Sequence, residues 1–286
     1  MKISSVEDKY FSGNSTMKIK DKLIEIANPL VMGILNCTPD SFYANSRISL
    51  ENELLDRIQK MVQEGADIID IGGYSTRPNA TFVSPEEEWN RIAPALQLLK
   101  AHFPDQLVSV DTFRSEIAEK SLNLGASIIN DISAGQADPE MLSVVAAHQV
   151  PYIAMHGFHQ KEQIHASPGH FSIAEMMRFF HDIKEKTAKK GVYDLILDPG
   201  FGFSKTIADN FEIMKNLSLF KTFDELLLVG ISRKSMIYKT LNIQPEEALN
   251  GTSVLNTIAL QKGASILRVH DVKAAKEVIQ FVQLSN

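Results

Sequence analysis

The stretch VMGILNCTPDSFY, residues 31–43, begins as an apolar strand and ends among oxygen-bearing side chains. A short aliphatic run is followed directly by Asn36, Thr38, Asp40 and Ser41. Asn, Pro, Asp and Ser are ordinary turn residues, so this end is open to interpretation as a plain turn. The alternative is that the strand tip belongs to a binding site. The rest of the chain distinguishes the two interpretations.

The same order of apolar strand, polar loop and amphipathic helix recurs along the whole chain. Strands are predicted at residues 31–36, 67–73, 107–112, 127–133, 151–156, 194–200, 225–232 and 265–271. Helical segments alternate with them; the one at residues 50–65 has Leu, Ile and Met at helical spacing and ends at a glycine. Alternating units of this kind predict parallel strands that close into a (β/α)8 TIM barrel, an α/β fold. An open doubly wound sheet is the alternative.

The N-terminal part of the chain differs from the repeating units. Residues 1–16 are predicted to form a polar tail, and residues 17–286 a single barrel domain. Apolar and polar residues alternate over residues 17–29, which predicts a short β-hairpin that caps the bottom of the barrel.

Composition limits the classes of function. The 286 residues carry a net charge of −6, whereas nucleic-acid binding usually needs a basic face, so we expect no nucleic-acid partner. Cys37 is the single cysteine, which excludes an internal disulfide and favours a reducing compartment. No apolar run approaches the roughly 20 residues of a membrane span. The sequence therefore predicts a cytoplasmic protein with no membrane partner.

Polar side chains follow almost every predicted strand, at the end where a barrel of this kind builds its active site. They are Asn36, the segment 72–78, Asp111, Asn130 and Asp131, Met155 and His156, Asp198, the segment 232–235, and Arg268, His270 and Asp271. Any one of them could be a helix cap, as Asp111 could for the segment after it. A barrel does not need a polar group after every strand, so the whole set indicates a site.

The set contains three kinds of chemistry. Cationic side chains suit an anion, Asp and Asn offer directed donors and acceptors to a flat heterocycle, and Asn36 with Asp40 offers oxygens of the kind that Mg²⁺ accepts. The cationic set is Arg77, Lys234, Arg268 and His270, and the heterocycle set is Asp111, Asn130 and Asp198.

Seven motifs at these strand ends, in this order along the chain, resemble the dihydropteroate synthase family. They are MGILNCTPDSF (32–42), GGYSTRP (72–78), SVDT (109–112), IIND (128–131), LDPGFGF (197–203), GISRKSM (230–236) and ILRVHDV (266–272). The resemblance covers about residues 19–283. It implies a transferase that joins 6-hydroxymethyl-7,8-dihydropterin diphosphate to 4-aminobenzoate, with Mg²⁺ as cofactor and loss of diphosphate as the first step.

The resemblance also implies roles for individual residues. The pterin would bind to Asp111, Asn130, Met155, Asp198, Gly230 and Lys234; the diphosphate to Thr76, Arg268 and His270; and the aminobenzoate to Arg77, Pro78, Phe203, Lys234 and Ser235. Asn36 would be the Mg²⁺ ligand, while Asp40 stays open as ligand, cation stabiliser or loop cap. Catalysis would fall to Asp111, Asp198, Lys234, Arg268, His270 and Asp40. Family members are commonly homodimers, which implies a homodimer here.

Residues 157–170 depart from the family, whose members usually have Met, Gly and Pro at the start of this loop. No contact is carried over from this segment, and its histidines favour a solvated loop over a zinc site. Two alternatives therefore stay open. One is a catalytically silent pterin-binding paralogue. The other is a pterin-dependent methyltransferase domain, which would lack the SRKS and RVHD motifs because it binds no diphosphate.

Overall fold

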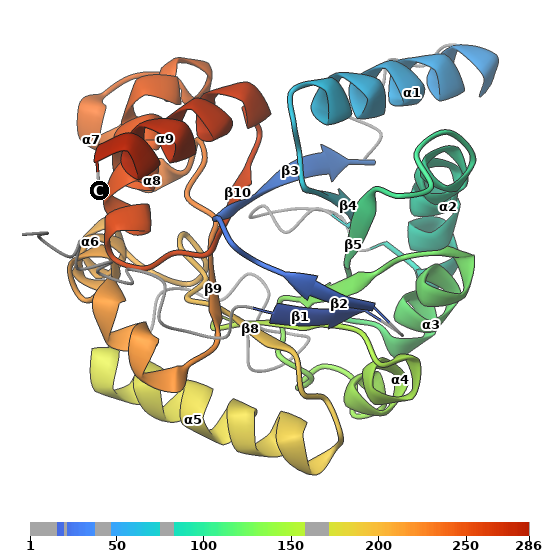
Figure 1. Ribbon diagram of the computed structural model, residues 1–286, viewed down its shortest axis with the longest axis horizontal. Coiled ribbons are helices and arrows are strands. Elements are labelled where there is room, and N and C mark those ends of the chain that lie inside the picture. The colour runs from blue at the N-terminus through green and yellow to red at the C-terminus, as the bar shows by residue number, and fades with distance from the viewer. Residues whose placement is uncertain (1–15, 20–21, 38–46, 75–82, 158–171, 286) are drawn as a thin grey trace, which may run out of the picture.

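The computed structural model describes residues 16–19, 22–37, 47–74, 83–157 and 172–285. Within these ranges eight parallel strands close into a barrel that helices surround (Figure 1). Around the barrel the strands follow the order β10, β3, β4, β5, β6, β7, β8, β9. Their bounds are β3 Leu30–Asn36, β4 Ile68–Gly72, β5 Leu107–Asp111, β6 Ile128–Asp131, β7 Tyr152–Met155, β8 Leu195–Asp198, β9 Leu226–Val229 and β10 Ile266–Val269. The closed barrel confirms the predicted fold and excludes the open sheet.

The described chain has one more α helix than the predicted alternation of eight strands with eight helices. The helices are α1 Arg47–Gln63, α2 Pro85–His102, α3 Ser115–Leu124, α4 Met141–His148, α5 Ile173–Lys189, α6 Ile207–Lys215, α7 Ser235–Leu241, α8 Leu249–Gln261 and α9 Val272–Ser285, with short 3-10 helices η3 Leu217–Phe223 and η4 Pro245–Glu247. The unpredicted one is α7, which ends because Asn242 adopts the left-handed conformation. None of the described helices has the length and apolar character needed to cross a membrane.

The N-terminal hairpin closes one end of the barrel, as predicted. Its strands β1 (Thr16–Ile19) and β2 (Lys22–Glu25) pair antiparallel. Met17 and Ile19 pack in one cluster with Ile68 and Ile128, the first residues of β4 and β6. Because parallel strands all start at the same end, this contact places the hairpin at the bottom. The rest of the predicted tail, residues 1–15, lies outside the described residues.

The barrel interior has an apolar floor beneath a polar layer. Met32, Ile68, Ile128, Ile153, Ile196, Leu228 and Ile266 belong to one buried cluster. Side chains two positions apart on a strand point to the same face, so the next interior residues are Ile34, Asp70, Asn130, Met155, Asp198, Gly230 and Arg268. Shortening one floor residue to alanine would cost about 2–5 kcal/mol. The polar layer therefore rests on a rigid base.

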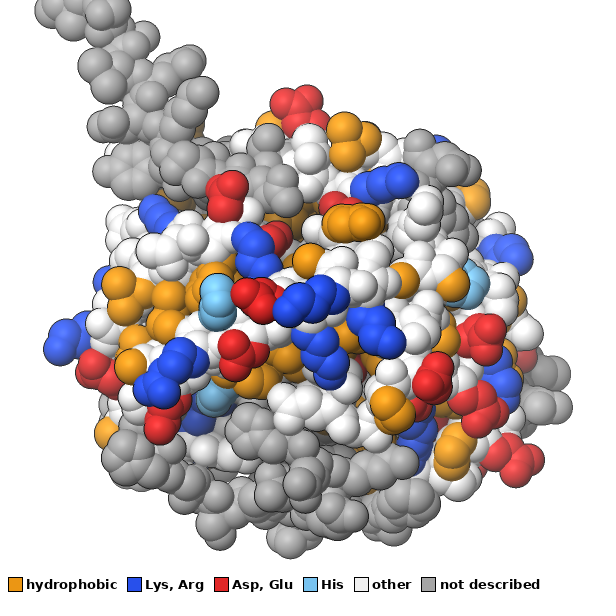
Figure 2. Space-filling model, turned by 90° about the horizontal axis from the view of Figure 1, so that it is seen from below, with side chains coloured by type: hydrophobic (Ala, Val, Ile, Leu, Met, Phe, Trp, Pro, Cys, Tyr) orange, Lys and Arg blue, Asp and Glu red, His pale blue; other side chains and the backbone are white. Residues whose placement is uncertain are grey.

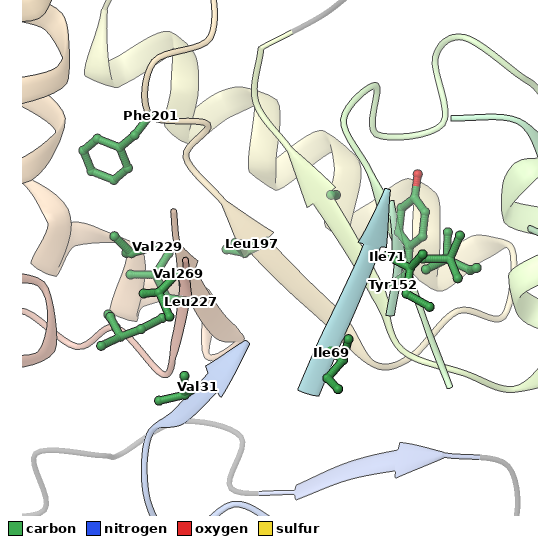
Figure 3. Packing of buried hydrophobic residues seen from close by; sticks show 14 of the residues in the cluster. Val31, Ile69, Ile71, Tyr152, Leu197, Phe201, Leu227, Val229 and Val269 are labelled. Carbon is green, nitrogen blue, oxygen red and sulfur yellow. The ribbon is translucent and has the colours of Figure 1, made fainter. Parts of the chain in front are cut away.

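The outward faces of the strands pack against the helices in a second, larger cluster. Figure 3 shows part of it, including Val31, Ile69, Leu197 and Val229. Gly33 lies on the outward face between Val31 and Leu35, where a Cβ would lie 3.0 Å from Cγ2 of Val272 at the start of α9. The glycine in the stretch VMGILN is thus explained by close approach of a helix to β3.

The surface carries charges of both signs. On the face seen in Figure 2, basic and acidic side chains are interspersed. Among the described residues some charges pair along helices, such as Arg91 with Glu87 on α2 and Lys120 with Glu116 on α3. Exposed pairs of this kind contribute about 0.2–1 kcal/mol each, so they affect solubility more than stability.

Candidate active site

Arg268 on β10 joins two neighbouring carboxylates in the polar layer. Its Nε donates to Asp70 Oδ2 on β4 at 2.7 Å, and its Nη2 donates to Asp111 Oδ2 on β5 at 2.9 Å. The Arg268 side chain is 16% exposed and the Asp70 side chain is fully buried. A planar guanidinium is well suited to hold two buried carboxylates at once. The structure thus places a predicted diphosphate residue beside Asp111, a predicted pterin residue.

Asp70 was not among the predicted site residues. Its Oδ2 also accepts a hydrogen bond from Asn130 Nδ2 on β6 at 3.2 Å, so one oxygen contacts both Arg268 and Asn130. The sequence contained a signal that would have identified it. An Asp in the middle of the otherwise aliphatic strand IIDIG needs a buried partner.

The carboxyl groups of the site protonate more readily than they would in water. Burial raises the pKa of Asp111 to about 7; the Arg268 guanidinium opposes this rise and the Asp70 carboxylate adds to it. Burial also raises the pKa of Asp198, against the opposing charge of Lys234. Asp198 Oδ1 is held by the Gly200 N–H at 2.7 Å. The two acids are therefore sensitive to any cation that enters the barrel mouth.

Lys234 crosses the site from the N-terminus of α7. Its Nζ donates to the Phe201 carbonyl and lies 4.5 Å from the centroid of the Phe203 ring. Burial lowers the pKa of Lys234 to about 8, while Asp198 opposes the shift. A Cβ on Gly230 would lie 3.9 Å from Lys234 Nζ and 3.7 Å from Arg268 Cβ. Gly230 thus separates the two cationic side chains, and Ser235, the first residue of α7, follows Lys234 directly.

A second residue that the sequence analysis missed is Lys205. Its Nζ donates to three backbone carbonyls: His156 at 2.8 Å, Gly200 at 2.9 Å and Phe203 at 3.0 Å. It therefore ties the loop after β7 to the loop after β8. Gly200 has a φ of 68°, and a Cβ there would lie 2.0 Å from the His156 carbonyl oxygen. These two loops can approach so closely only where residue 200 is a glycine.

Lys205 and the following Thr206 both make contacts that fix the local backbone. Thr206 caps α6, since its hydroxyl accepts from the Asp209 N–H at 3.1 Å and its own N–H donates to Asp209 Oδ2 at 2.7 Å. Burial lowers the pKa of Lys205 to about 7. Residues 205 and 206 therefore hold the backbone around Phe203 in place.

His270, a predicted diphosphate residue, follows β10 next to Ser232. Its Nδ1 lies 3.1 Å from the Ser232 hydroxyl, and its backbone N–H donates to the same oxygen at 3.2 Å. Burial lowers the pKa of His270 to about 4, and the charges of Arg268 and Arg233 lower it further. The ring is therefore neutral at pH 7 and offers a hydrogen bond rather than a charge. Arg233 forks to Asp271 at 3.0 and 2.7 Å.

Asn36 marks the tip of β3 at the barrel mouth. A Cβ on the neighbouring Gly72 would lie 3.9 Å from Asn36 Oδ1 and 3.7 Å from Asp111 Cβ, so Asn36 faces the same side as Asp111. The described residues contain no group of three or more His, Cys, Asp or Glu side chains arranged for a metal ion. One neutral amide oxygen fits an ion held mainly by water and substrate phosphates, as Mg²⁺ often is.

Asp131, counted among the polar strand ends, does not face the site. It accepts hydrogen bonds from the Ser133 N–H and hydroxyl, the Gly135 N–H and the Tyr152 hydroxyl, at 2.7–2.8 Å. Its side chain points outward because it lies one residue after the inward-facing Asn130. Asp131 therefore fixes the loop that leaves β6.

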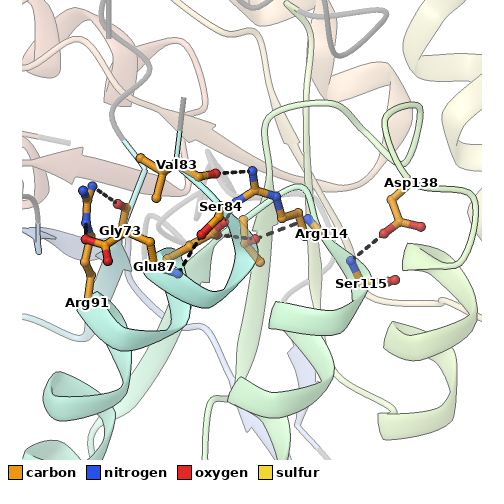
Figure 4. A network of polar contacts seen from close by, with 10 residues as sticks. Gly73, Val83, Ser84, Glu87, Arg91, Arg114, Ser115 and Asp138 are labelled. Atoms are coloured by element: carbon orange, nitrogen blue, oxygen red, sulfur yellow. Dashed lines mark hydrogen bonds and ion pairs between the residues drawn. The ribbon is translucent and has the colours of Figure 1, made fainter. Parts of the chain in front are cut away.

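A network of polar contacts fixes Gly73, after β4, and Val83, before α2 (Figure 4). Glu88 on α2 is fully buried and pairs with Arg114, whose Nη2 donates to the Val83 carbonyl at 2.6 Å. Arg91 Nη1 donates to the Gly73 carbonyl at 3.0 Å. Gly73 is thereby fixed to α2, and Val83 to Arg114 at the start of α3.

Several predicted residues lie outside the described residues. They are Asp40, Thr76, Arg77, Pro78 and residues 158–170 of the segment whose sequence differs from the family. Their roles stay predictions.

Comparisons with known proteins find relatives over most of the chain. A model of the family described as pterin binding enzyme matches residues 32–270. The dihydropteroate synthase of Escherichia coli K12 is 39% identical over 266 residues, which is 91% of this chain and 93% of the relative. A structure of Xanthomonas albilineans dihydropteroate synthase with 4-aminobenzoic acid has a TM-score of 0.87 at 33% identity, covering 95% of this chain and 98% of that one. Yersinia pestis dihydropteroate synthase with a sulfonamide drug has a TM-score of 0.86 at 37% identity, covering 94% and 98%. This chain therefore belongs to the pterin-binding enzymes and, within them, to the dihydropteroate synthase family.

Proposed function

We propose that this chain condenses 6-hydroxymethyl-7,8-dihydropterin diphosphate with 4-aminobenzoate to give 7,8-dihydropteroate and diphosphate. The observation that carries the proposal is the interior cluster in which Arg268 pairs with Asp111 and is linked through Asp70 to Asn130, with the interacting Asp198 and Lys234 at the same mouth. The relatives' names support it: the chain is 39% identical to a dihydropteroate synthase over most of its length.

Pterin recognition is assigned to the polar layer. Asp111 and Asp198 accept hydrogen bonds from the N–H groups of the guanidine-like edge of the ring, which suits carboxylates held in a fixed direction. Asn130 supplies a directed amide, and Lys234 donates to a ring acceptor. Met155, 2% exposed, and Gly230 line the apolar faces of the ring. Because the layer rests on the aliphatic floor, these groups are preorganised before substrate binds.

The first chemical step breaks the bond between the pterin methylene carbon and the diphosphate oxygen, and the electron pair leaves with the diphosphate. The pterin then carries a methylene cation, which the carboxylates of Asp111 and Asp198 stabilise. Arg268, His270 and Thr76 bind the departing diphosphate, with neutral His270 acting as a hydrogen-bond donor. Mg²⁺ bound at Asn36 would neutralise phosphate charge. Asp40 would act at the same step as metal ligand, cation stabiliser or loop cap.

The second step joins the aminobenzoate nitrogen to the methylene carbon, and the nitrogen then loses a proton to solvent water. Phe203, beneath the Lys234 ammonium, offers a face on which the aromatic ring packs. Ser235, Arg77 and Pro78 complete this pocket, and Lys234 or Arg77 balances the carboxylate.

The test is incubation of the purified chain with both substrates and Mg²⁺ while dihydropteroate is measured. Product that disappears in Asp198→Asn supports the proposal. Tight pterin binding without any product would instead establish a catalytically silent pterin-binding protein. Transfer of a methyl group from a methylated pterin would establish the methyltransferase alternative.

We also propose a homodimer, a single domain over residues 17–286 after a polar tail, and a cytoplasmic location. The dimer is supported by apolar side chains exposed on neighbouring helices: Leu241 on α7, Val254 on α8 and Phe281 on α9 are 53%, 52% and 72% exposed. Light scattering should give twice the 31.8 kDa of the chain. Val254→Asp should lower that mass and Tyr193→Asp, elsewhere on the surface, should not. A monomeric wild type would refute the dimer. The cytoplasmic location is supported by Cys37, a free thiol of the kind that persists in a reducing compartment.

A further inference from the structure

We propose that Asp70 is a positioning residue whose buried carboxylate sets both the direction of the Arg268 guanidinium and the amide orientation of Asn130. The inference rests on the proposed function of the site. It concerns a residue that lies outside the seven strand-end motifs.

The position of Asp70 leaves its side chain no route to solvent. It lies in the middle of β4, in register with Ile34 on β3 and Ser109 on β5. Ile68 of the aliphatic floor lies below it, and the residue is 0% exposed. A charge buried this deeply is held only by specific partners, and those partners are the two site residues Arg268 and Asn130.

The contact with Asn130 determines which half of the amide faces the substrate. An ionised carboxylate can only accept hydrogen bonds, so the Asn130 NH₂ group must face Asp70 Oδ2, 3.2 Å away. The Asn130 carbonyl oxygen then points the other way, as a fixed acceptor. A heterocycle presents donors and acceptors in alternation along its edge. An amide free to rotate would match it only part of the time.

The contact with Arg268 determines which N–H groups the guanidinium offers. Asp70 engages Nε at 2.7 Å and Asp111 engages Nη2 at 2.9 Å. Among the described residues no hydrogen bond to Nη1 is found, which leaves its N–H groups for an oxygen of the substrate. Without Asp70, the guanidinium would be held by Asp111 alone and could rotate about that bond.

The remaining contacts of Asp70 argue against a purely structural role. Its Oδ1 has no hydrogen-bond partner among the described residues, and neither has the hydroxyl of Ser109 beside it. A buried oxygen without a partner is unfavourable, and a neutral side chain would suit the strand better. Orientation of Arg268 and Asn130 gives a reason for the charge.

The experiment compares Asp70→Asn with Ser109→Ala, which changes the buried residue in register with it. Asp70→Asn still leaves Arg268 paired with Asp111, so the positive charge is not left uncompensated. Calorimetry with 6-hydroxymethylpterin, which has no diphosphate, should give roughly 10- to 100-fold weaker binding for Asp70→Asn, the effect typical of residues that orient a ligand-binding group. Ser109→Ala should stay within about twofold of the wild type.

Two further readouts separate positioning from a structural role. The charged groups that shift the pKa of Asp111 are Arg268, Asp70, Glu88 and Asp131, and Lys234 also interacts with it. Because the Asp70 charge raises the Asp111 pKa, Asp70→Asn should move the acid limb of the kcat/KM profile to lower pH. In an Arg268→Gln background, Asp70→Asn should lower pterin affinity again through Asn130 but add little to the loss of kcat. In this double variant the side chains at positions 70 and 268 are both neutral, so it tests the inference even if Asp70→Asn alone does not fold.

The outcomes distinguish this inference from the proposed function. Folded Asp70→Asn with unchanged pterin affinity and an unshifted acid limb would overturn the inference while leaving the function intact. A wild type that binds pterin but forms no dihydropteroate would overturn the function, and the calorimetry would still decide the inference. A wild type that does not bind pterin would overturn both.

Discussion

Removing the Arg268 guanidinium should destabilise the barrel far more than removing a similar ion pair at its surface. Arg268→Ala leaves the fully buried Asp70 and the 18% exposed Asp111 without their cation. Stranding a buried charge in this way costs about 3–5 kcal/mol of unfolding free energy. Arg233→Ala is the matched control. Arg233 makes a bidentate ion pair with Asp271, but these two side chains are 30% and 24% exposed. Its loss should be below about 1 kcal/mol.

The loss in Arg268→Ala should also depend on pH, with a definite sign. Burial already raises the pKa of Asp111 in the folded protein to about 7, against the opposing charge of Arg268. Without Arg268 the folded-state pKa rises further above the unfolded value of about 3.9. A carboxyl whose pKa is higher in the folded state penalises folding increasingly as the pH rises from the unfolded to the folded pKa. The variant should therefore resemble the wild type more at pH 5.5 (roughly midway between these limits) than at pH 8.

The assay is urea unfolding followed by far-UV circular dichroism at both pH values for the wild type, Arg268→Ala and Arg233→Ala. Equal losses for the two variants would refute the argument that burial decides the effect. An Arg268→Ala loss that is the same at both pH values would refute the assignment of the loss to Asp111.

Three other predictions concern single features of the structure. The kcat/KM for the pterin substrate should fall about tenfold per pH unit below about 7, where Asp111 becomes protonated; a profile flat to pH 5 would contradict this. Gly200→Ala should lose more than about 3 kcal/mol or fail to fold, because its φ is 68° and the Cβ would clash with the His156 carbonyl. Gly191→Ala, with φ 82° but no neighbour closer than 3.9 Å, should lose only about 1 kcal/mol of unfolding free energy. Thermal unfolding of both variants measures the difference. Cys37, 4% exposed and with its pKa raised to about 12 by burial, should react with a thiol reagent only after unfolding; rapid reaction of the native protein would contradict its placement.

The period-two alternation of the strands explains why most of the site could be predicted. Asn130 lies two residues after a floor isoleucine, and so does Asp198. An inventory of strand ends therefore finds such residues. The same inventory wrongly includes Asp131, the residue after Asn130, whose side chain points outward and contacts Tyr152. It also overlooks Asp70, because that residue lies inside its strand rather than at the tip.

Other features of the site depend on contacts between residues distant in sequence. Lys205 was not predicted as a site residue, and in the folded chain its Nζ donates to carbonyls of two loops that are 49 and 2–5 residues away. Arg268 and Asp70 are separated by 198 positions and meet only because β10 and β3 close the barrel. Helix α7 was missed because seven residues are too few to establish a helical period.

The sequence by itself determined the alternation of strands and helices, the closure into a barrel and the chemical kinds of side chain at its mouth. These follow from hydrophobic period and local turn chemistry, which are properties of neighbouring residues. Only the tertiary structure decided how the polar groups pair: that Arg268 is shared by Asp70 and Asp111, that the Asn130 amide donates to Asp70, and that burial lowers the pKa of His270. Pairing and pKa depend on burial and on distances between strands, and neither exists before the barrel closes. VMGILN is accordingly a barrel strand whose glycine admits α9 and whose last residue, Asn36, faces Asp111 across Gly72.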